Sequence, residues 1–270
     1  MASATFRIWR GSGTEGAFVD YRTEVSEGMV VLDAVHRIQA EQAPDLACRW
    51  NCKAGKCGSC SAEINGRPRL MCMTRLNVLP LEQPVTIEPL QTFPPVRDLV
   101  TDVSWNYRVK EKITPFTPKP ADADGTWRMA QEDIDRVQEF RKCIECYLCQ
   151  DVCHVLREHR MHDQFVGPRF LVHLAALEMH PLDVEDRLPA VKDASGVGYC
   201  NITKCCTNVC PEHITITDNA IIPLKERVVD RFYDPVARLL RLFRGNGGRR
   251  SDAPAEAPVG GRHPRGAGES

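Results

Sequence analysis

The feature that most constrains this chain is a pair of cysteine runs, Cys143–Cys153 and Cys200–Cys210. The first run has the spacing C-x2-C-x2-C-x3-C, and the second repeats it with Thr203 in place of the second cysteine. Three thiolates spaced two residues apart on a tight loop can converge on three corners of a cube, while the fourth points toward a second cube. The fold must therefore bring the two runs together around two cubane-type iron–sulfur clusters.

If the fourth cysteine of each run binds the cluster of the other run, the cysteines of both runs divide between two sites. The predicted ligands of the first site, a [4Fe-4S] cluster, are Cys143, Cys146, Cys149 and Cys210. The predicted ligands of the second site are Cys153, Cys200 and Cys206. Iron in such clusters prefers soft sulfur, so the hydroxyl of Thr203 is a poor ligand beside thiolates. One corner should stay empty, which predicts a [3Fe-4S] cluster.

Cys205 lies beside the predicted ligand Cys206 and is not explained by the spacing. Adjacent residues on a tight loop usually point apart, so we expect Cys205 to be a buried free thiol. The alternative is that Cys205 reaches the open corner and completes a [4Fe-4S] cluster.

A third cysteine group lies nearer the N-terminus and has the spacing C-x4-C-x2-C, followed by a distant cysteine. This is the plant-type [2Fe-2S] pattern. Its predicted ligands are Cys52, Cys57, Cys60 and Cys72. Gly55 and Gly58 allow the backbone to bend closely around the cluster, and N–H groups aimed at the sulfurs tune its potential. Cys48 falls outside this register and should be a buried apolar residue.

Zinc and disulfides are the competing interpretations of a chain with 13 cysteines. Two C-x2-C pairs could hold a tetrahedral zinc ion, but zinc does not require the third and fourth cysteines of each run. The N-terminus is polar and lacks an apolar signal core, which indicates the cytosol, where thiols stay reduced. The net charge of −1 gives no argument for binding nucleic acid. No apolar run approaches the roughly 18–20 residues that span a bilayer.

The hydrophobic pattern predicts an α+β domain followed by a mainly helical domain. In the first domain we expect strands at 6–9, 18–25 and 85–88 and a helix at 30–39. In the second we expect helices at 129–140 and 170–179. Three prolines predict an extended segment at 114–125.

The C-terminal region divides into an amphipathic segment and a tail. Residues 224–243 carry an apolar stripe beside a basic face, with a break expected at Pro235. This stripe packs on its own domain or docks on a membrane anchor through Phe232, Leu239 and Leu240. The predicted domains are 1–105 and 106–245, with a disordered tail at 246–270.

Together, these motifs resemble the iron–sulfur subunit of succinate dehydrogenase and fumarate reductase. The resemblance covers about residues 5–215 and rests on the order of the motifs, plant-type first and bacterial-type after. It extends to Ala62–Gly66, Leu70–Cys72, Arg97–Val103 and Gly167-Pro168. The family has proline after the fourth cysteine of the first run, where this chain has His154, and the following segment lacks the tryptophans that the family often carries near quinone.

The resemblance implies a plant-type [2Fe-2S] ferredoxin (β-grasp) domain, followed by a helical bacterial-ferredoxin-like domain. It implies an electron-transfer subunit of the tricarboxylic acid cycle, with no catalytic acid, base or nucleophile of its own. The implied partners are a flavoprotein that oxidises succinate at FAD and a membrane anchor where quinone is reduced near the [3Fe-4S] cluster. The chain would be peripheral, on the cytoplasmic face of the cell membrane.

Three alternatives to this function remain open. Fumarate reductase would run the same path backward, and the sequence does not fix the direction. The iron–sulfur subunit of another flavin-linked oxidoreductase would lack the plant-type domain. A zinc-binding interaction module is the alternative from another class of protein.

The segment after the first cysteine run contains three histidines, His154, His159 and His162. Because histidine titrates near neutrality, these side chains could donate protons to a reduced quinone. The competing interpretation is a solvated basic loop or a contact with another subunit.

Overall fold

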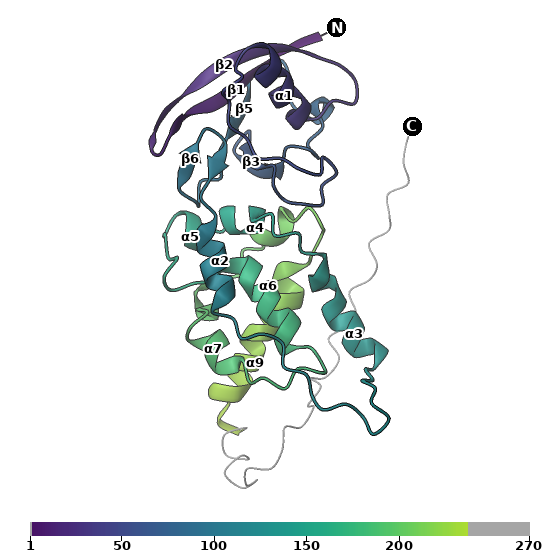
Figure 1. The fold of residues 1–270 in the computed structure, drawn as a ribbon. Coiled ribbons are helices and arrows are strands. Elements are labelled where there is room, and N and C mark those ends of the chain that lie inside the picture. The colour runs from purple at the N-terminus through teal and green to yellow at the C-terminus, as the bar shows by residue number, and fades with distance from the viewer. Residues whose placement is uncertain (1, 237–270) are drawn as a thin grey trace.

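The structure is a computed structural model that describes residues 2–236. Figure 1 shows a β-rich N-terminal part stacked on a helical part. The described strands form a seven-stranded sheet in the order β4-β3-β5-β1-β6-β7, with β2 also paired to β1. The strands are β1 (Ala2–Ser12), β2 (Glu15–Val25), β3 (Ser61–Ile64), β4 (Arg67–Leu70), β5 (Val85–Glu88), β6 (Pro95–Arg97) and β7 (Val100–Thr101).

The N-terminal part is built around β1, which lies antiparallel to β2 and parallel to β5. The period of two along β1 places Phe6 and Ile8 on one face, where both are fully buried. Helix α1 (Val31–Glu41) covers this face with Val35 and Ile38, at helical spacing. The strands expected at 6–9, 18–25 and 85–88 and the helix expected at 30–39 are confirmed.

The helical part surrounds α6, which lies at its centre in Figure 1. Its helices are α2 (Ser104–Glu111), α3 (Gln131–Gln138), α4 (Leu148–Asp151), α5 (His154–Arg157), α6 (Gly167–Glu178), α7 (Leu188–Lys192), α8 (Cys205–Asn208) and α9 (Ile222–Phe232). Short helical turns lie at η1 (Leu76–Val78), η2 (Glu139–Lys142), η3 (Val197–Tyr199) and η4 (Ile216–Ile221). Most of α6 is buried in a core that also holds α9 and η4.

The two helices expected in this part are confirmed, with shifted ends. The first, expected at 129–140, is α3 continued by the tighter turn η2. The second starts earlier than expected because Pro168 stands at the first turn of α6, where its missing N–H has no helical partner to lose. The proline-rich segment is irregular as expected, and Pro118 forms an isolated bridge with Asp183.

The C-terminal stripe is described only as far as Val236. Helix α9 ends at Phe232, before Pro235, as expected. Phe232 was a candidate for docking on an anchor, but it packs against the protein's own core, because it continues the buried stripe of Leu224 and Val228 by one turn. Leu239, Leu240 and the tail at 246–270 lie outside the described residues.

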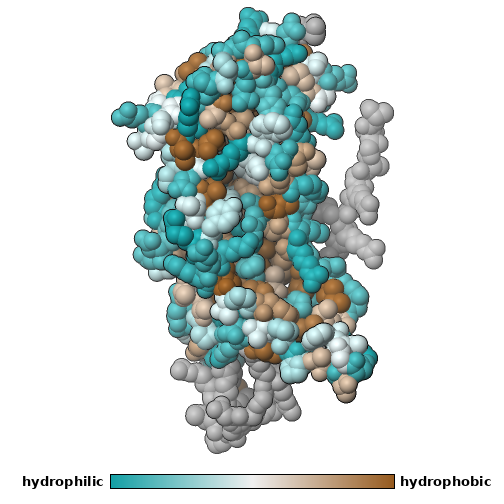
Figure 2. Space-filling model, in the orientation of Figure 1, coloured by the Kyte–Doolittle hydropathy of each residue, from teal (hydrophilic) through white to brown (hydrophobic). Residues whose placement is uncertain are grey.

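Within residues 2–236, no helix is both long enough and apolar enough to cross a membrane. Figure 2 shows a mostly hydrophilic face with separate hydrophobic patches.

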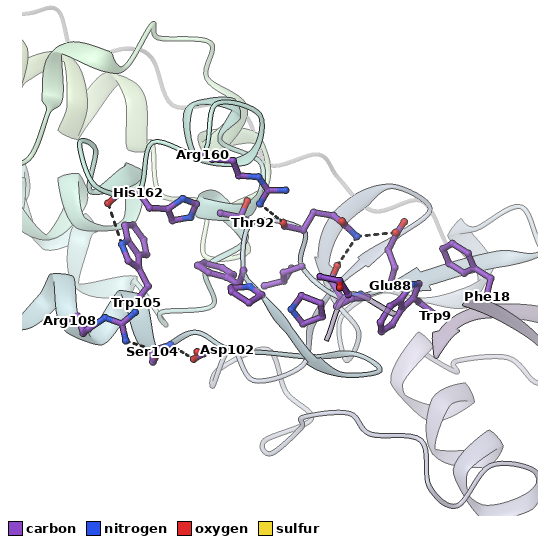
Figure 3. A pocket seen from close by; sticks show the side chains of 17 residues that line it. Trp9, Phe18, Glu88, Thr92, Asp102, Ser104, Trp105, Arg108, Arg160 and His162 are labelled. Carbon is purple, nitrogen blue, oxygen red and sulfur yellow. Dashed lines mark hydrogen bonds between the residues drawn. The ribbon is translucent and has the colours of Figure 1, made fainter. Parts of the chain in front are cut away.

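A groove of about 720 Å³ marks the junction of the two parts. Figure 3 shows its lining, which comes from the sheet on one side and from α2 and the loop after α5 on the other. Trp105 Nε1 donates a hydrogen bond to the carbonyl of His162 at 3.3 Å. Arg160 Nη1 donates to the carbonyl of Gln91 at 3.0 Å. These bonds tie the loop after α5 to α2 and to the sheet domain.

Candidate iron–sulfur sites

The first cysteine group lies on the loop between α1 and β3, with its last member just after β4. Cys52 is exposed, whereas Cys60 and Cys72 are buried. Backbone N–H groups point at the sulfurs, and those of Ala54 and Lys56 both lie 3.3 Å from Cys52 Sγ. Such bonds favour the thiolate over the thiol, which is the form that binds iron.

The hydrogen bonds of this loop also act on Cys57. Burial works against ionisation, but bonds from Ser59 and from the backbone of Cys52 lower the pKa of the Cys57 thiol to about 6. Gly55 and Gly58 both have φ of +68°, as their predicted role in the bend requires. Cys48 packs against the core of the sheet domain, and burial raises the pKa of its thiol to about 11.

The first group touches the second at Gly58. A Cβ on this residue would lie 2.7 Å from the Cα atom of Cys146, so glycine is what allows the two loops to meet. Ser61 Oγ lies 2.9 Å from the carbonyl oxygens of both Gly58 and Cys146. Lys56 Nζ forms an ion pair with Glu212 at 2.9 Å, beside Cys210. Two groups far apart in the sequence are thus in direct backbone contact.

The second cysteine group surrounds a small, largely apolar cavity. The cysteines that line it are Cys143, Cys146, Cys149 and Cys210, which are the four predicted ligands. Ile144, Val172, Ile214 and Ile216 complete much of the wall. The N–H of Ile214 lies 3.4 Å from Cys210 Sγ. A small, largely apolar cavity with four sulfur donors fits a cubane cluster.

A charged network lies against this site, and the sequence interpretation missed it. Glu145 stands between two predicted ligands and accepts bonds from Lys110 Nζ at 2.7 Å and from Arg169 Nη2 at 2.5 Å. Burial opposes ionisation, but these two cations lower the pKa of the Glu145 carboxyl. No spacing rule predicts this, because Arg169 reaches the loop from α6.

The third cysteine group lines another cavity of the helical part. Its predicted ligands Cys153, Cys200 and Cys206 all line it. Thr217, a buried residue of η4, lies 3.5 Å from Cys206 Sγ through its hydroxyl oxygen. Thr203 lines the cavity as well, at the position that the register assigns to the missing cysteine.

Cys205 differs from its expected position. It was expected to be a buried thiol pointing away from Cys206, but it is only half-buried and lines the same cavity. Its sulfur lies 3.2 Å from the hydroxyl oxygen of Thr203. Both residues can face one cavity because Cys205 and Cys206 open helix α8 after Lys204, whose φ is +62°.

The three histidines after the first run do not form one group, although the rings of His154 and His159 lie edge-on with centroids 6.2 Å apart. His154 lines the third cavity, and its Nε2 lies 2.8 Å from the amide nitrogen of Asn201. His159 is exposed. His162 packs edge-on against Trp105 at the junction groove, with ring centroids 4.8 Å apart. Only His154 is therefore placed beside a predicted cluster.

A buried charge cluster joins the two parts of the protein beside these sites. Glu63 on β3 is 1% exposed, and Arg157 donates to both of its carboxylate oxygens. Asp151, between the predicted ligands Cys149 and Cys153, is fully buried and lies 3.9 Å from the same guanidinium. Burial and the nearby Glu63 raise the pKa of the Asp151 carboxyl to about 8.

The arrangement of the cysteines bears on the two alternatives raised by the sequence, disulfides and zinc. All thirteen cysteines lie in the described part of the chain and all are free thiols, which excludes the disulfide interpretation here. Within residues 2–236, no three histidine, cysteine or carboxylate side chains converge as the ligands of one metal ion do. The thiols of the second and third groups instead line cavities, as cluster ligands do, because the irons of a cluster lie between the sulfurs and the cluster centre.

Two family models match successive parts of the chain. A 2Fe-2S iron–sulfur cluster binding domain matches residues 5–107, and a 4Fe-4S dicluster domain matches residues 139–214. These matches agree with the coarse fold, a mixed-sheet 2Fe-2S domain followed by a helical 4Fe-4S region.

The chain is similar to several known iron–sulfur proteins. It is 31% identical to the succinate dehydrogenase iron–sulfur subunit of Paracoccus denitrificans, over 76% of this chain and 78% of that protein. It is 30% identical to the fumarate reductase iron–sulfur subunit of Mycobacterium tuberculosis, over 73% of this chain and 80% of that protein. It spans only 42% of an uncharacterized iron–sulfur protein of Methanococcus maripaludis, at 31% identity.

One solved structure is similar over nearly its whole length. A chain of the Mycobacterium smegmatis Sdh1 complex in the apo form is 62% identical, with a TM-score of 0.84. The match covers 87% of this chain and 98% of that chain.

Proposed function

The chain belongs to the family of iron–sulfur subunits of succinate dehydrogenase and fumarate reductase, and on this premise we propose that it carries electrons from succinate to quinone. The partners of this proposal are a flavoprotein with FAD at one end and a membrane anchor at the other. The protein would be peripheral and held by the anchor on the cytoplasmic face of the cell membrane.

One observation carries the proposal: the three cysteine groups form a continuous series across the protein. The first group begins at the exposed Cys52 and meets the second at the contact between Gly58 and Cys146. The second and third are interleaved, since Cys153 follows the second group in the same run and lines the third cavity. Such a series suits transfer over short steps from one surface to another.

We assign the clusters as the spacing predicts. The [2Fe-2S] ligands are Cys52, Cys57, Cys60 and Cys72. The [4Fe-4S] ligands are Cys143, Cys146, Cys149 and Cys210. The [3Fe-4S] ligands are Cys153, Cys200 and Cys206. The proposed domains are 1–105, with a β-grasp topology, and 106–245, and the sheet order and helix content support this division.

When bound, the clusters would act as one-electron carriers, and the residues of this chain would set the polarity and hydrogen bonding around them. N–H groups directed at Cys52 Sγ and Cys210 Sγ stabilise negative charge on sulfur and so tune the potential. The second cavity is lined largely by apolar side chains, together with Arg169 and Glu212, and this weakly polar environment strengthens these electrostatic effects. The contact at Gly58 keeps the first and second groups close together.

The exposed first loop offers a surface for the flavoprotein. Trp50 is 48% exposed and Met73 is 58% exposed, and Lys53 Nζ lies 4.8 Å from the centroid of the Trp50 ring. Exposed aromatic and methionine side chains beside a cluster loop are the kind of residue that buries well at a protein interface. Docking here would bring FAD near Cys52.

The far end of the series offers a surface for the anchor and quinone. Tyr199 and Ile202 are exposed beside the third cavity, and His154 lines that cavity. Its Nε2 lies 2.8 Å from the amide nitrogen of Asn201, which holds the imidazole in one orientation. We assign His154, rather than His159 or His162, as the histidine nearest to the quinone.

The test is co-purification from membranes. We expect a flavoprotein and at least one membrane-spanning subunit to accompany the chain, and the assembly to reduce quinone when succinate is added. Recovery without either partner, or an assembly that is inert toward succinate and fumarate, would contradict the proposal. The relative rates of succinate oxidation and fumarate reduction then decide the direction in the cell.

A further inference from the structure

The two cysteine runs fold into loops of the same backbone shape. Glu145 and Tyr147 have φ of +54° and +62° in the first run. Ile202 and Lys204, at the matching positions of the second, both have φ of +62°. The match means that side chains at equivalent positions should point the same way unless something redirects them. In this register Cys205 corresponds to Leu148 of the first run.

Leu148 and Cys205 both line a groove between β4, α4 and α8, but only Cys205 also lines the cavity of its own cysteine group. Leu148 is 1% exposed and belongs to the hydrophobic core of the sheet domain. Cys205 lines the third cavity together with the three predicted ligands. Its sulfur lies 3.2 Å from the hydroxyl oxygen of Thr203, which occupies the position of the second ligand, Cys146, in the first run. The cysteine therefore brings sulfur to the corner that Thr203 leaves without a thiolate.

We propose that Cys205 supplies a fourth thiolate to the third site, which takes up and releases a fourth iron and so interconverts between [3Fe-4S] and [4Fe-4S]. The inference rests on the proposed function, since it presupposes the [3Fe-4S] cluster. The inference concerns the regulation of that site, because the [3Fe-4S] and [4Fe-4S] clusters differ in reduction potential. Only the [3Fe-4S] cluster has a corner without iron.

The conversion balances with one Fe²⁺ and one electron. An oxidised [3Fe-4S]⁺ cluster first takes one electron, from succinate in the cell or from dithionite in a test. The neutral cluster then binds Fe²⁺ through three of its sulfides. The thiol of Cys205 gives its proton to water and forms the fourth bond to this iron. The product is [4Fe-4S]²⁺, and its one-electron oxidation with release of Fe²⁺ restores the starting cluster.

The position of Cys205 also suits exchange with the surroundings. Besides the cavity, it lines a surface groove of about 570 Å³ between β4, α4 and α8. Cys153 and Cys206 are buried, whereas Cys200 and Cys205 are half-buried and Thr203 is exposed. The fourth corner thus lies on the accessible side of the cavity, and iron can reach it without opening the core.

The test uses the purified, cluster-loaded complex. It is reduced anaerobically with dithionite, given Fe²⁺, desalted and divided for iron analysis and electron paramagnetic resonance. We expect the wild type to gain about one iron per chain. After mild reoxidation, the wild type should no longer show the signal of an oxidised [3Fe-4S] cluster, because the cluster is now [4Fe-4S]. Full air oxidation should release that iron and restore the signal. Cys205→Ser and Cys205→Ala should gain no iron and keep the signal throughout.

Two matched variants control the experiment. Cys48→Ser removes another cysteine outside the predicted ligand sets and should behave as the wild type. Thr203→Cys places a thiol at the position matching Cys146 and should retain the fourth iron even after air oxidation. Iron uptake by Cys205→Ser equal to that of the wild type, or none by the wild type, would overturn the inference while the proposed function stands. A preparation without clusters would instead refute the proposed function.

Discussion

Replacing Arg157 with methionine tests whether the buried charge cluster holds the two domains together. Arg157 pairs with Glu63 of the sheet domain and lies 3.9 Å from Asp151 of the first cysteine run. Methionine keeps most of the length and apolar area of arginine but removes the charge. The variant leaves two buried carboxyl groups facing each other without a cation.

The size of the effect follows from burial. Removing one partner of a buried ion pair costs about 3–5 kcal/mol. Arg157 is 28% exposed, so water already screens part of the interaction and the lower end of that range applies. For a chain of this size, about 3 kcal/mol lowers the midpoint of thermal unfolding by about 6–12 °C. Glu63→Gln should cost less, because the guanidinium of Arg157 can turn toward water.

The assay is loss of visible cluster absorbance on heating at a fixed scan rate. The control is Arg7→Met, which breaks an ion pair with Asp20 whose side chains are 44% and 46% exposed, and it should leave the midpoint unchanged. The double variant Arg157→Met/Glu63→Gln should lose less than the sum of the two single variants. If Arg157→Met were as stable as Arg7→Met, the charge cluster would contribute nothing to domain association and the reasoning would be wrong.

Three further predictions follow from the sites. Anaerobically isolated protein should contain about nine irons per chain, the sum of the three predicted clusters; a value near two, or one equivalent of zinc, would contradict the assignments. Gly58→Ala should weaken cluster retention, because the new Cβ would lie 2.7 Å from the Cα atom of Cys146. Gly66→Ala is the control: Gly66 has a similar φ but no atom within 4 Å of a new Cβ, so this variant shows the effect of backbone strain alone. Burial, together with the charges of Arg169 and Lys110, lowers the pKa of His173 to about 4. Between pH 6.5 and 4 the unfolded chain therefore binds a proton at this residue that the folded protein does not. The free energy of unfolding should fall by about 1 kcal/mol as the pH drops over this range. His173→Leu should remove this acid-dependent loss in a pH series of thermal midpoints; an unchanged loss would refute the assignment.

The sequence predicted the elements and cysteine groups that depend on local spacing. The hairpin at the N-terminus, α1 and the two principal helices all follow from apolar periodicity. The grouping of Cys143, Cys146, Cys149 and Cys210 around one cavity follows from a loop register that leaves few other arrangements. Helix α6 begins earlier than expected because Pro168 is favoured in the first turn of a helix.

The residues that the sequence did not predict act across the two domains. Asp151 lies between two predicted ligands, and an acid in a run of cysteines was a signal that could have been followed. Its partners could not be found this way, because Glu63 and Thr92 come from the sheet domain, and the N–H of Thr92 donates to Asp151 Oδ1 at 2.9 Å. Pairings over such sequence distances depend on how two finished domains dock, which periodicity does not describe.

The backbone of the cysteine loops shows why cluster binding and folding are coupled in this chain. Glu145, Tyr147, Ile202 and Lys204 all have positive φ without being glycine, at a cost of about 1–2 kcal/mol each. Ile202 is β-branched, for which this conformation is least favourable. Local propensity therefore opposes both loops, and the surrounding helices are too short to impose them. Thiolate–iron bonds can impose them, since each cluster fixes three or four points along the loops at once. In the first run Glu145 and Tyr147 alternate with predicted ligands, and in the second Ile202 and Lys204 lie between the predicted ligands Cys200 and Cys206, so the strain lies where the bonds that offset it would form.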